Sequence, residues 1–174
     1  MKYAAAITNF IAFELAWLAA VWGGAAGWPW LGSVPALLVA VLHLALSRGQ
    51  RLREGLLIAA ITVLGFALES GFMAAGLIDY AGTEPGQIAA PVWIMALWFG
   101  FATLPNASLS WLRGRWGLQF MLGAIAGPLT YWGGVKLGAA TIPDGTGALF
   151  WIGLAWALTM PVIFLLADAI SPRR

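Results

Sequence analysis

The chain has 174 residues, of which 61% are hydrophobic and only 9% are charged, and its mean hydropathy is +0.87. A soluble domain averages about 25% charged residues, so most of this chain belongs in a bilayer. The net charge of +2 comes without a basic patch interleaved with aromatic residues, and we therefore expect no nucleic-acid partner. Because cysteine is absent, disulfides, thiol catalysis and thiolate metal sites are excluded.

Six apolar segments are candidates to cross a hydrocarbon core of about 30 Å, which takes roughly 20 helical residues. They lie at about 4–24, 30–47, 54–78, 90–112, 117–141 and 146–170. The stretches between them are rich in Gly, Pro and charge, which is typical of turns. The sequence therefore predicts an all-α fold, in which residues 1–174 form a single polytopic membrane domain built as a bundle of six transmembrane helices.

The charged residues outside the spans divide by sign between the two sides of this bundle. One side carries Lys2, Arg48, Arg51, Arg53, Arg113, Arg115, Arg173 and Arg174. The turns on the other side carry Asp79, Glu84 and Asp144. Since cytoplasmic loops of membrane proteins collect Lys and Arg, the pattern predicts that both termini are cytoplasmic.

The first and third spans each carry a glutamate within the apolar run, Glu14 and Glu69. Glu69 shares a helix face with Thr62, Gly65 and Gly76, and such a small and polar stripe faces protein and not lipid. An ionised carboxylate in hydrocarbon costs several kcal/mol, so an acid at this depth is a candidate functional group. Two carboxyl groups at one level could share a proton, hold a cation or donate a proton to an unsaturated lipid. The alternative is that each acid is a protonated or hydrogen-bonded packing group.

A second polar layer is predicted nearer the cytoplasmic side. His43 lies late in the second span, Asn9 early in the first and Asp168 late in the sixth. On the fourth span, Asn106 follows Pro105 and could satisfy backbone groups that the proline releases. A single histidine excludes the multi-histidine metal centres of membrane oxidoreductases, and no Gly-rich phosphate loop is present. We therefore predict no metal site and no cofactor.

The fifth span combines small residues with two polar side chains. Its glycines at 123, 127, 134 and 138 fall on one face and indicate close helix packing. Tyr131 follows a kink expected at Pro128, lies toward the level of Glu69 and could donate to its carboxylate. Lys136 is expected to extend to the membrane surface, with an ion pair to Glu69 as the alternative.

Tryptophan is abundant, with eleven residues. Seven lie near predicted span boundaries and resemble an interfacial belt: Trp22, Trp28, Trp30, Trp93, Trp111, Trp116 and Trp151. Four lie deeper: Trp17, Trp98, Trp132 and Trp156. Aromatic side chains at that depth either pack the core or line an apolar ligand cavity.

The order of several segments resembles a bacterial family of small integral inner-membrane proteins with no assigned function. The resemblance runs almost end to end and is carried by His43 and by residues 9–32, 64–76, 91–112 and 123–139, the third of which reads "PVWIMALWFGFATLPNASLSWL". It implies a multi-pass protein of the bacterial inner membrane.

Together these observations lead to the expectation that the bundle binds, or also modifies, an apolar membrane lipid or isoprenoid. Glu69 and Glu14 would be the acid groups. The predicted ligand-binding residues are Tyr131, Trp98, Trp132, Trp156, Asn106 and His43. Two alternatives stay open: a small proton-coupled transporter, and a structural or accessory subunit without a ligand. Six short spans leave little room for alternating access, so a transporter would require a homo-oligomer.

Overall fold

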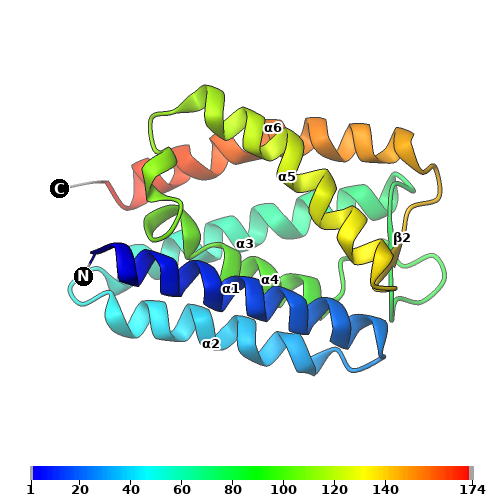
Figure 1. The fold of residues 1–174 in the computed structure, drawn as a ribbon, viewed down its shortest axis with the longest axis horizontal. Helices are drawn as coiled ribbons and strands as arrows, with labels where there is room; N and C mark the ends of the chain where they lie inside the picture. The colour runs from blue at the N-terminus through cyan, green and yellow to red at the C-terminus, as the bar shows by residue number, and fades with distance from the viewer. Residues whose placement is uncertain (1, 173–174) are drawn as a thin grey trace.

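The computed structural model describes residues 2–172, which form six α-helices and one two-stranded ribbon (Figure 1). The all-α prediction is confirmed. The helices are α1 (Lys2–Ala25), α2 (Trp30–Leu46), α3 (Arg51–Ala74), α4 (Val92–Phe101), α5 (Trp116–Lys136) and α6 (Thr146–Ile170). The strands are β1 (Asp79–Tyr80) and β2 (Ala140–Thr141), which pair antiparallel. Two 3₁₀ turns, η1 (Leu104–Asn106) and η2 (Ser110–Leu112), follow α4.

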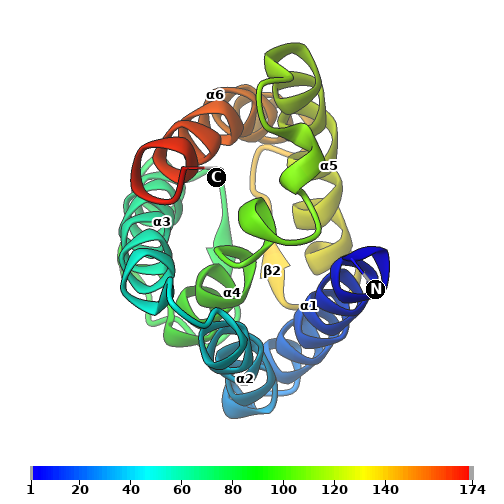
Figure 2. The ribbon, with the colours of Figure 1, turned by 90° about the vertical axis from the view of Figure 1, so that its left-hand side faces the viewer.

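Viewed along the bundle, the helices form a ring (Figure 2). Packing follows the order α1, α2, α4, α3, α6 and α5 around this ring, and α1 also contacts α4. α1 and α5 are the first and last helices in this order. They lie next to each other, but within the described residues their backbones are not closely packed. The ring of helices is therefore least closed between α1 and α5.

Three helices are long and apolar enough to cross a membrane within the part of the chain that the structure describes. They are α1 from Ala4 onward, α3 and α6. The outward faces of the helices also carry many exposed large apolar side chains, which suits contact with lipid. α2 and α4 are apolar but shorter. These findings support a membrane protein, although helix length and hydropathy together identify only three of the six predicted spans.

The fourth predicted span differs most from the structure. A continuous helix was expected over 90–112, but α4 ends at Phe101 after 10 residues and the chain continues in η1 and η2. Pro105 lacks a backbone N–H and lies inside η1, where the α-helical hydrogen bonds stop. Asn9 of α1 stabilises this break, because its Nδ2 donates to Thr103 Oγ1 at 2.9 Å and its Oδ1 accepts from the Ser108 hydroxyl at 2.9 Å. The segment is thus half helix and half irregular chain.

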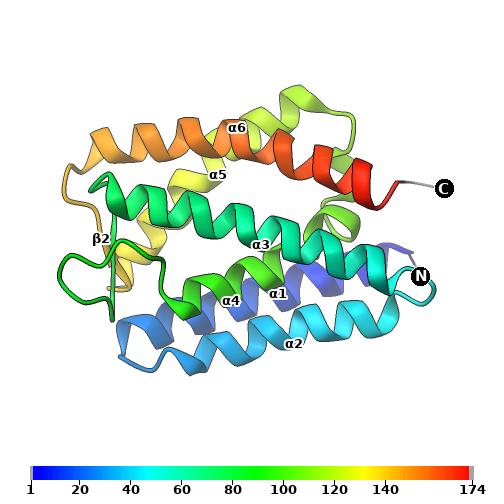
Figure 3. The ribbon, with the colours of Figure 1, turned by 180° about the vertical axis from the view of Figure 1, so that it is seen from behind.

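The bundle has two chemically distinct ends (Figures 1 and 3). At one end lie the start of α1, the α2–α3 turn, the segment before α5 and the end of α6, and we call it the arginine end. At the other lie the α1–α2 turn, the α5–α6 turn and the β1–β2 ribbon, and we call it the ribbon end. The arginines within 2–172 all belong to the first end, and Arg173 and Arg174 lie outside the described residues. Asp79, Glu84 and Asp144 belong to the second.

Candidate functional site

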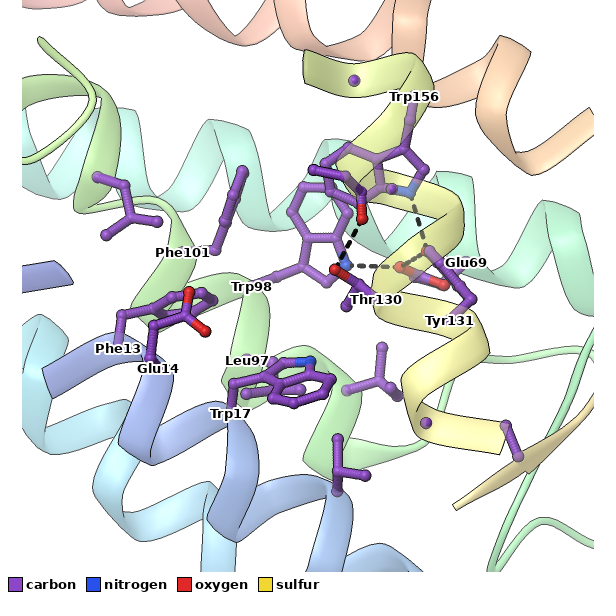
Figure 4. Close-up of a pocket in the computed structure, with 18 of the residues that line it drawn as sticks. Phe13, Glu14, Trp17, Glu69, Leu97, Trp98, Phe101, Thr130, Tyr131 and Trp156 are labelled. Atoms are coloured by element: carbon purple, nitrogen blue, oxygen red, sulfur yellow. Dashed lines mark hydrogen bonds between the residues drawn. The ribbon is translucent and has the colours of Figure 1, made fainter. Parts of the chain in front are cut away.

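A cavity of about 400 Å³ lies inside the bundle, with walls from α1, α3, α4, α5, α6, η1 and the ribbon (Figure 4). Most of its wall is apolar. Its aromatic residues are Phe10, Phe13, Trp17, Tyr80, Trp93, Trp98, Phe101, Tyr131 and Trp156. Two acids, Glu14 and Glu69, belong to the described wall, which includes no Lys, Arg or His. The cavity therefore combines an apolar volume with two carboxyl groups.

Glu69 is the centre of a buried hydrogen-bonded group that we call the acid cluster: Glu69, Tyr80, Trp98, Tyr131 and Trp156. Glu69 is 3% exposed. Its Oε1 accepts from the Tyr131 hydroxyl at 2.6 Å and from Trp98 Nε1 at 3.0 Å, and its Oε2 accepts from the Tyr80 hydroxyl. Trp156 Nε1 donates in turn to the Tyr131 hydroxyl at 3.1 Å. Every direct partner of Glu69 is a neutral donor from another element of the fold.

Two glycines leave room for the indole rings of Trp98 and Trp156 in the acid cluster. A Cβ at Gly65, one turn before Glu69 on α3, would lie 2.0 Å from Trp98 Cδ2. A Cβ at Gly127 on α5 would lie 2.6 Å from Trp156 Cγ. Without those atoms, the rings of Trp98 and Trp156 stack at 5.2 Å with 14° between their planes. The stack brings one indole N–H to Glu69 and the other to Tyr131 (Figure 4).

The ribbon supplies the remaining donor. Tyr80 pairs with Ala140 across the two strands, and its ring packs edge-on against Trp93 at 5.6 Å. Burial, and next the negative charge of Glu69, raise the pKa of the Tyr80 hydroxyl well above its usual range. Tyr80 therefore keeps its proton and donates it in a hydrogen bond to Glu69.

Glu14 belongs to the same cavity but not to the acid cluster. It lies eleven residues before the end of α1, whereas Glu69 lies five residues before the end of α3, and both helices end at the ribbon end. At about 1.5 Å per residue, the two acids differ in level by roughly 9 Å. No hydrogen bond or ion pair joins Glu14 to any residue in the described part of the chain. The structure thus brings both acids to one cavity without placing them at one level.

The cavity has an opening on its side. Four of its wall residues are exposed, and these belong to α1 (Phe10 and Glu14) or to α5 (Ala126 and Thr130). α1 and α5 come closest further along, where a Cβ at Gly133 would lie 3.4 Å from Trp17 Cη2. We call the gap between the two helices the lateral opening. In a bilayer it would face lipid.

Trp132 does not line the cavity, although the sequence analysis places it there. It is 50% exposed on the outer face of α5. The reason is helical geometry, since successive residues point about 100° apart and the preceding Tyr131 points inward. Lys136 Nζ lies 5.4 Å from the centre of the Trp132 ring. Lys136 therefore lies on this outer face, and its predicted alternative, an ion pair with Glu69, is wrong.

His43 and Asn106 lie away from the cavity and bind a second buried acid, Glu54, near the arginine end. Glu54 Oε2 lies 2.9 Å from His43 Nε2, and Oε1 accepts from Asn106 Nδ2 and Ser171 Oγ, each at 2.7 Å. Asn106 was expected to satisfy backbone groups near Pro105, but its side-chain nitrogen binds Glu54 instead. We call these residues, with Arg113, the arginine-end network.

Arg113 fastens the end of α6 to this network. It was expected in an exposed turn, yet it is 9% exposed. Its guanidinium donates to the carbonyl oxygens of Ala167 and Ser171, each at 3.1 Å, and to Asn106 Oδ1. It also forms an ion pair with Asp168 at 3.1 Å. Within residues 2–172, no three His, Asp or Glu side chains are grouped to hold a metal ion.

Sequence reasoning missed three of these residues. Glu54 looks like an ordinary acid in the first turn of a helix, Tyr80 lies in a turn-like stretch, and Trp93 was assigned to the interfacial belt. Trp93 is 3% exposed, and its Nε1 donates to the Ala81 carbonyl at 3.3 Å. Only the contact of Glu54 with His43 could have been predicted. His43 lies near the end of α2 and Glu54 near the start of α3, so the short turn between these helices brings the two side chains to the same end of the bundle.

A family model described as "Protein of unknown function (DUF2878)" matches residues 6–162. The chain belongs to this family. The predicted resemblance to a nearly full-length family of unknown function is therefore confirmed. The DUF2878 match includes the whole acid cluster and Glu14, whereas Asp168 and Ser171 of the arginine end follow it. Searches of curated proteins and of solved structures return no match.

Proposed function

We propose that this DUF2878 member is an inner-membrane protein that binds an apolar lipid or isoprenoid inside its bundle. The observation that carries the proposal is the cavity of about 400 Å³, whose wall is mostly aromatic and aliphatic and whose exposed wall residues lie on α1 and α5. Pockets that bury most of a small apolar ligand have this composition and size. The lateral opening would let such a ligand enter from the bilayer without passing through water.

A six-span orientation with both termini cytoplasmic is part of the proposal. The arginines gather at one end of the bundle and the free acids at the other, in agreement with the rule that positive charge stays inside. Exposed tryptophans flank both ends, with Trp28, Trp30 and Trp151 toward the ribbon and Trp111 and Trp116 toward the arginines. Reporter fusions at Gln50 and Gly114 should read cytoplasmic, and fusions at Ala26, Thr83 and Gly145 periplasmic. A periplasmic signal at Gly114 would overturn this orientation.

The acid cluster supplies the polar group that orients the ligand. Glu69 and Tyr131 both belong to the cavity wall, so a hydroxyl or carbonyl group of the ligand could exchange hydrogen bonds with them. The same pair can pass a proton, which is the role expected of a buried carboxyl group and phenol if the ligand is also modified. Glu69 is thus the acid that we assign to this chemistry.

A cavity-filling variant tests the proposal. Gly134 is buried in the cavity wall, and a Cβ there would meet no atom within 4 Å, so Gly134→Leu should fill the cavity without disturbing the helices. Gly117→Leu is the matched control, because Gly117 is exposed on the same helix and equally free of neighbours. Both changes also remove a helical glycine, which favours the helix.

Mass spectrometry of the lipids that co-purify in detergent gives the readout. We expect an apolar compound bound to the wild type and to Gly117→Leu, and several-fold less of it on Gly134→Leu. Equal amounts of the compound on the two variants would show that it binds outside the cavity. If no compound co-purifies with the wild type, the proposal is wrong. A proton-driven flux through the wild type in liposomes, without a retained compound, would favour the transporter.

A further inference from the structure

The charge of the cavity wall restricts which apolar molecule it can accept. Its described residues include two carboxyl groups and no basic side chain. At low dielectric, an unbalanced charge acts strongly on any charged group that approaches. A fatty-acid carboxylate or a lipid phosphate in this cavity would meet two carboxyl groups and no basic side chain. A cation would meet opposite charge, and complementary charge of this kind decides which ligand a site accepts.

The two acids are not equivalent toward a ligand. Glu69 already accepts three hydrogen bonds from Tyr80, Trp98 and Tyr131. Glu14 has no hydrogen-bond or ion-pair partner among the described residues, and it lies exposed at the lateral opening. A carboxylate in the hydrocarbon layer is costly unless it is paired, so a cation from outside the chain would stabilise the charged form of Glu14.

The surroundings of Glu14 also favour a cation. Figure 4 shows Glu14 beside Phe13, with Trp17 along the same helix and Phe101 further into the cavity. The rings of Phe13 and Phe101 lie 5.8 Å apart, and those of Phe101 and Trp156 lie 5.7 Å apart. Aromatic faces attract cations, most strongly where water is excluded. A carboxylate next to such rings resembles the sites that proteins use for ammonium groups.

We infer that the ligand is a lipophilic cation, in which an amine or quaternary ammonium group pairs with Glu14 at the lateral opening while the apolar body fills the cavity toward the acid cluster. The inference rests on the proposed function, because it names the chemical class of ligand for the same cavity. It also assigns Glu14 and Glu69 different roles, since Glu14 recognises the charged group and Glu69 organises the far wall.

Three probes with one chain length and different headgroups test the inference: dodecyltrimethylammonium, dodecanol and dodecanoate. Binding to the full-length protein is measured by calorimetry in an uncharged detergent, with tryptophan fluorescence as a second readout. One charge pair in an apolar site is worth about tenfold or more in affinity. We therefore expect the ammonium probe to bind about tenfold more tightly than dodecanol, and dodecanoate to bind most weakly.

Variants separate this inference from the proposed function. Glu14→Gln should remove the preference for the ammonium probe and leave dodecanol unchanged, whereas Glu84→Gln, which neutralises an exposed acid at the ribbon end, should change neither. If dodecanol and the ammonium probe bind with equal affinity, the inference about the charged headgroup is wrong, and the proposal that the cavity binds an apolar ligand is kept. If none of the probes binds, the proposed function fails as well. If Glu14→Gln changes only the oligomeric state, Glu14 is an interface residue and the inference is wrong. The comparison of headgroups on the wild type needs no variant to fold.

Discussion

α3 carries two buried acids near its opposite ends, and the chain satisfies them in different ways. Glu54 and Glu69 are fifteen residues apart, and each accepts hydrogen bonds from three side chains. The partners of Glu54 include His43, and the basic Arg113 lies behind Asn106 in the same network. The partners of Glu69 are phenols and an indole. Glu54 lies away from the cavity, whereas Glu69 is part of its wall.

This difference indicates different uses for the same residue type. The arginine-end network joins α2, α3, η1 and the end of α6, so it closes one end of the bundle. A buried acid that is bound by basic neighbours stabilises the fold locally, and removing it lowers the free energy of unfolding. Among residues 2–172, no basic side chain contacts the acid cluster to keep Glu69 ionised, and the cluster borders the cavity. Changes at Glu54 should therefore affect stability most, and changes at Glu69 should affect the ligand most.

The largest expected effect is that of Glu54→Leu. The change leaves His43, Asn106 and Ser171 without their common acceptor, and each buried donor left without a partner costs about 1–3 kcal/mol. Thermal unfolding in detergent, followed by circular dichroism, measures the loss. Glu84→Leu, the same substitution at an exposed acid, is the control and should leave Tm nearly unchanged. An unaltered Tm for Glu54→Leu would show that the network contributes little to stability.

Gly65→Ala should have the next largest effect. The added Cβ would lie 2.0 Å from Trp98, which cannot move freely because it stacks on Trp156. Overpacking of this kind costs about 1–3 kcal/mol. The change should also weaken the near-ultraviolet circular dichroism of the stacked indoles. Gly55→Ala, on the same helix and without neighbours, should stabilise by about 0.5–1 kcal/mol. If the two variants behave alike, Gly65 does not position Trp98.

Glu69→Gln should cost less stability than either, about 1 kcal/mol, because the amide oxygen can still accept from Trp98 and Tyr131. The Tyr80 hydroxyl can turn to accept from the amide nitrogen. The amount or identity of the co-purifying compound should nevertheless change, since the wall loses a carboxyl group that can give up or take a proton. A loss of stability as large as that of Glu54→Leu, with an unchanged ligand, would reverse the distinction between the two acids.

The smallest effect is expected from Ser171→Ala. This change removes one of three donors to Glu54 and leaves the other two in place, so it should cost about 0.5–1 kcal/mol. The same unfolding assay measures it, and the ligand should stay unchanged. A cost comparable with that of Glu54→Leu would mean that the end of α6, and not the acid itself, holds the network together.

The sequence predicted the inward position of Glu69 because periodicity is visible where small residues interrupt an apolar helix. Gly65 lies on the same face as Glu69, and in the structure that face meets Trp98. Tyr131 was expected near Glu69 for a similar reason, and its hydroxyl donates to that acid. Trp132 shows the limit of this reasoning. Where almost every residue of a helix is apolar, hydropathy does not indicate which side faces inward.

The features that the sequence did not predict depend on contacts between distant segments. Tyr80 reaches Glu69 only because β1 pairs with β2, sixty residues later in the chain. Asn106 and Ser171 meet at Glu54 although they lie 65 residues apart in the chain. The early end of α4 was missed because hydropathy measures how apolar a segment is and does not measure whether its backbone stays helical around Pro105.

The short α4 has a consequence for how the protein is made. A helix of 10 residues extends about 15 Å, half the thickness of the hydrocarbon layer, and the irregular chain after it would expose unpaired peptide groups to lipid tails. Such a segment cannot leave the translocation channel as an independent unit. The packing partners of α4 are α1, α2 and α3, which are all synthesised before it, whereas η1 also packs on α6, which is synthesised later. The order of the helices along the chain therefore lets α4 pack as soon as it is made, and the irregular chain after it is completed only when α6 arrives.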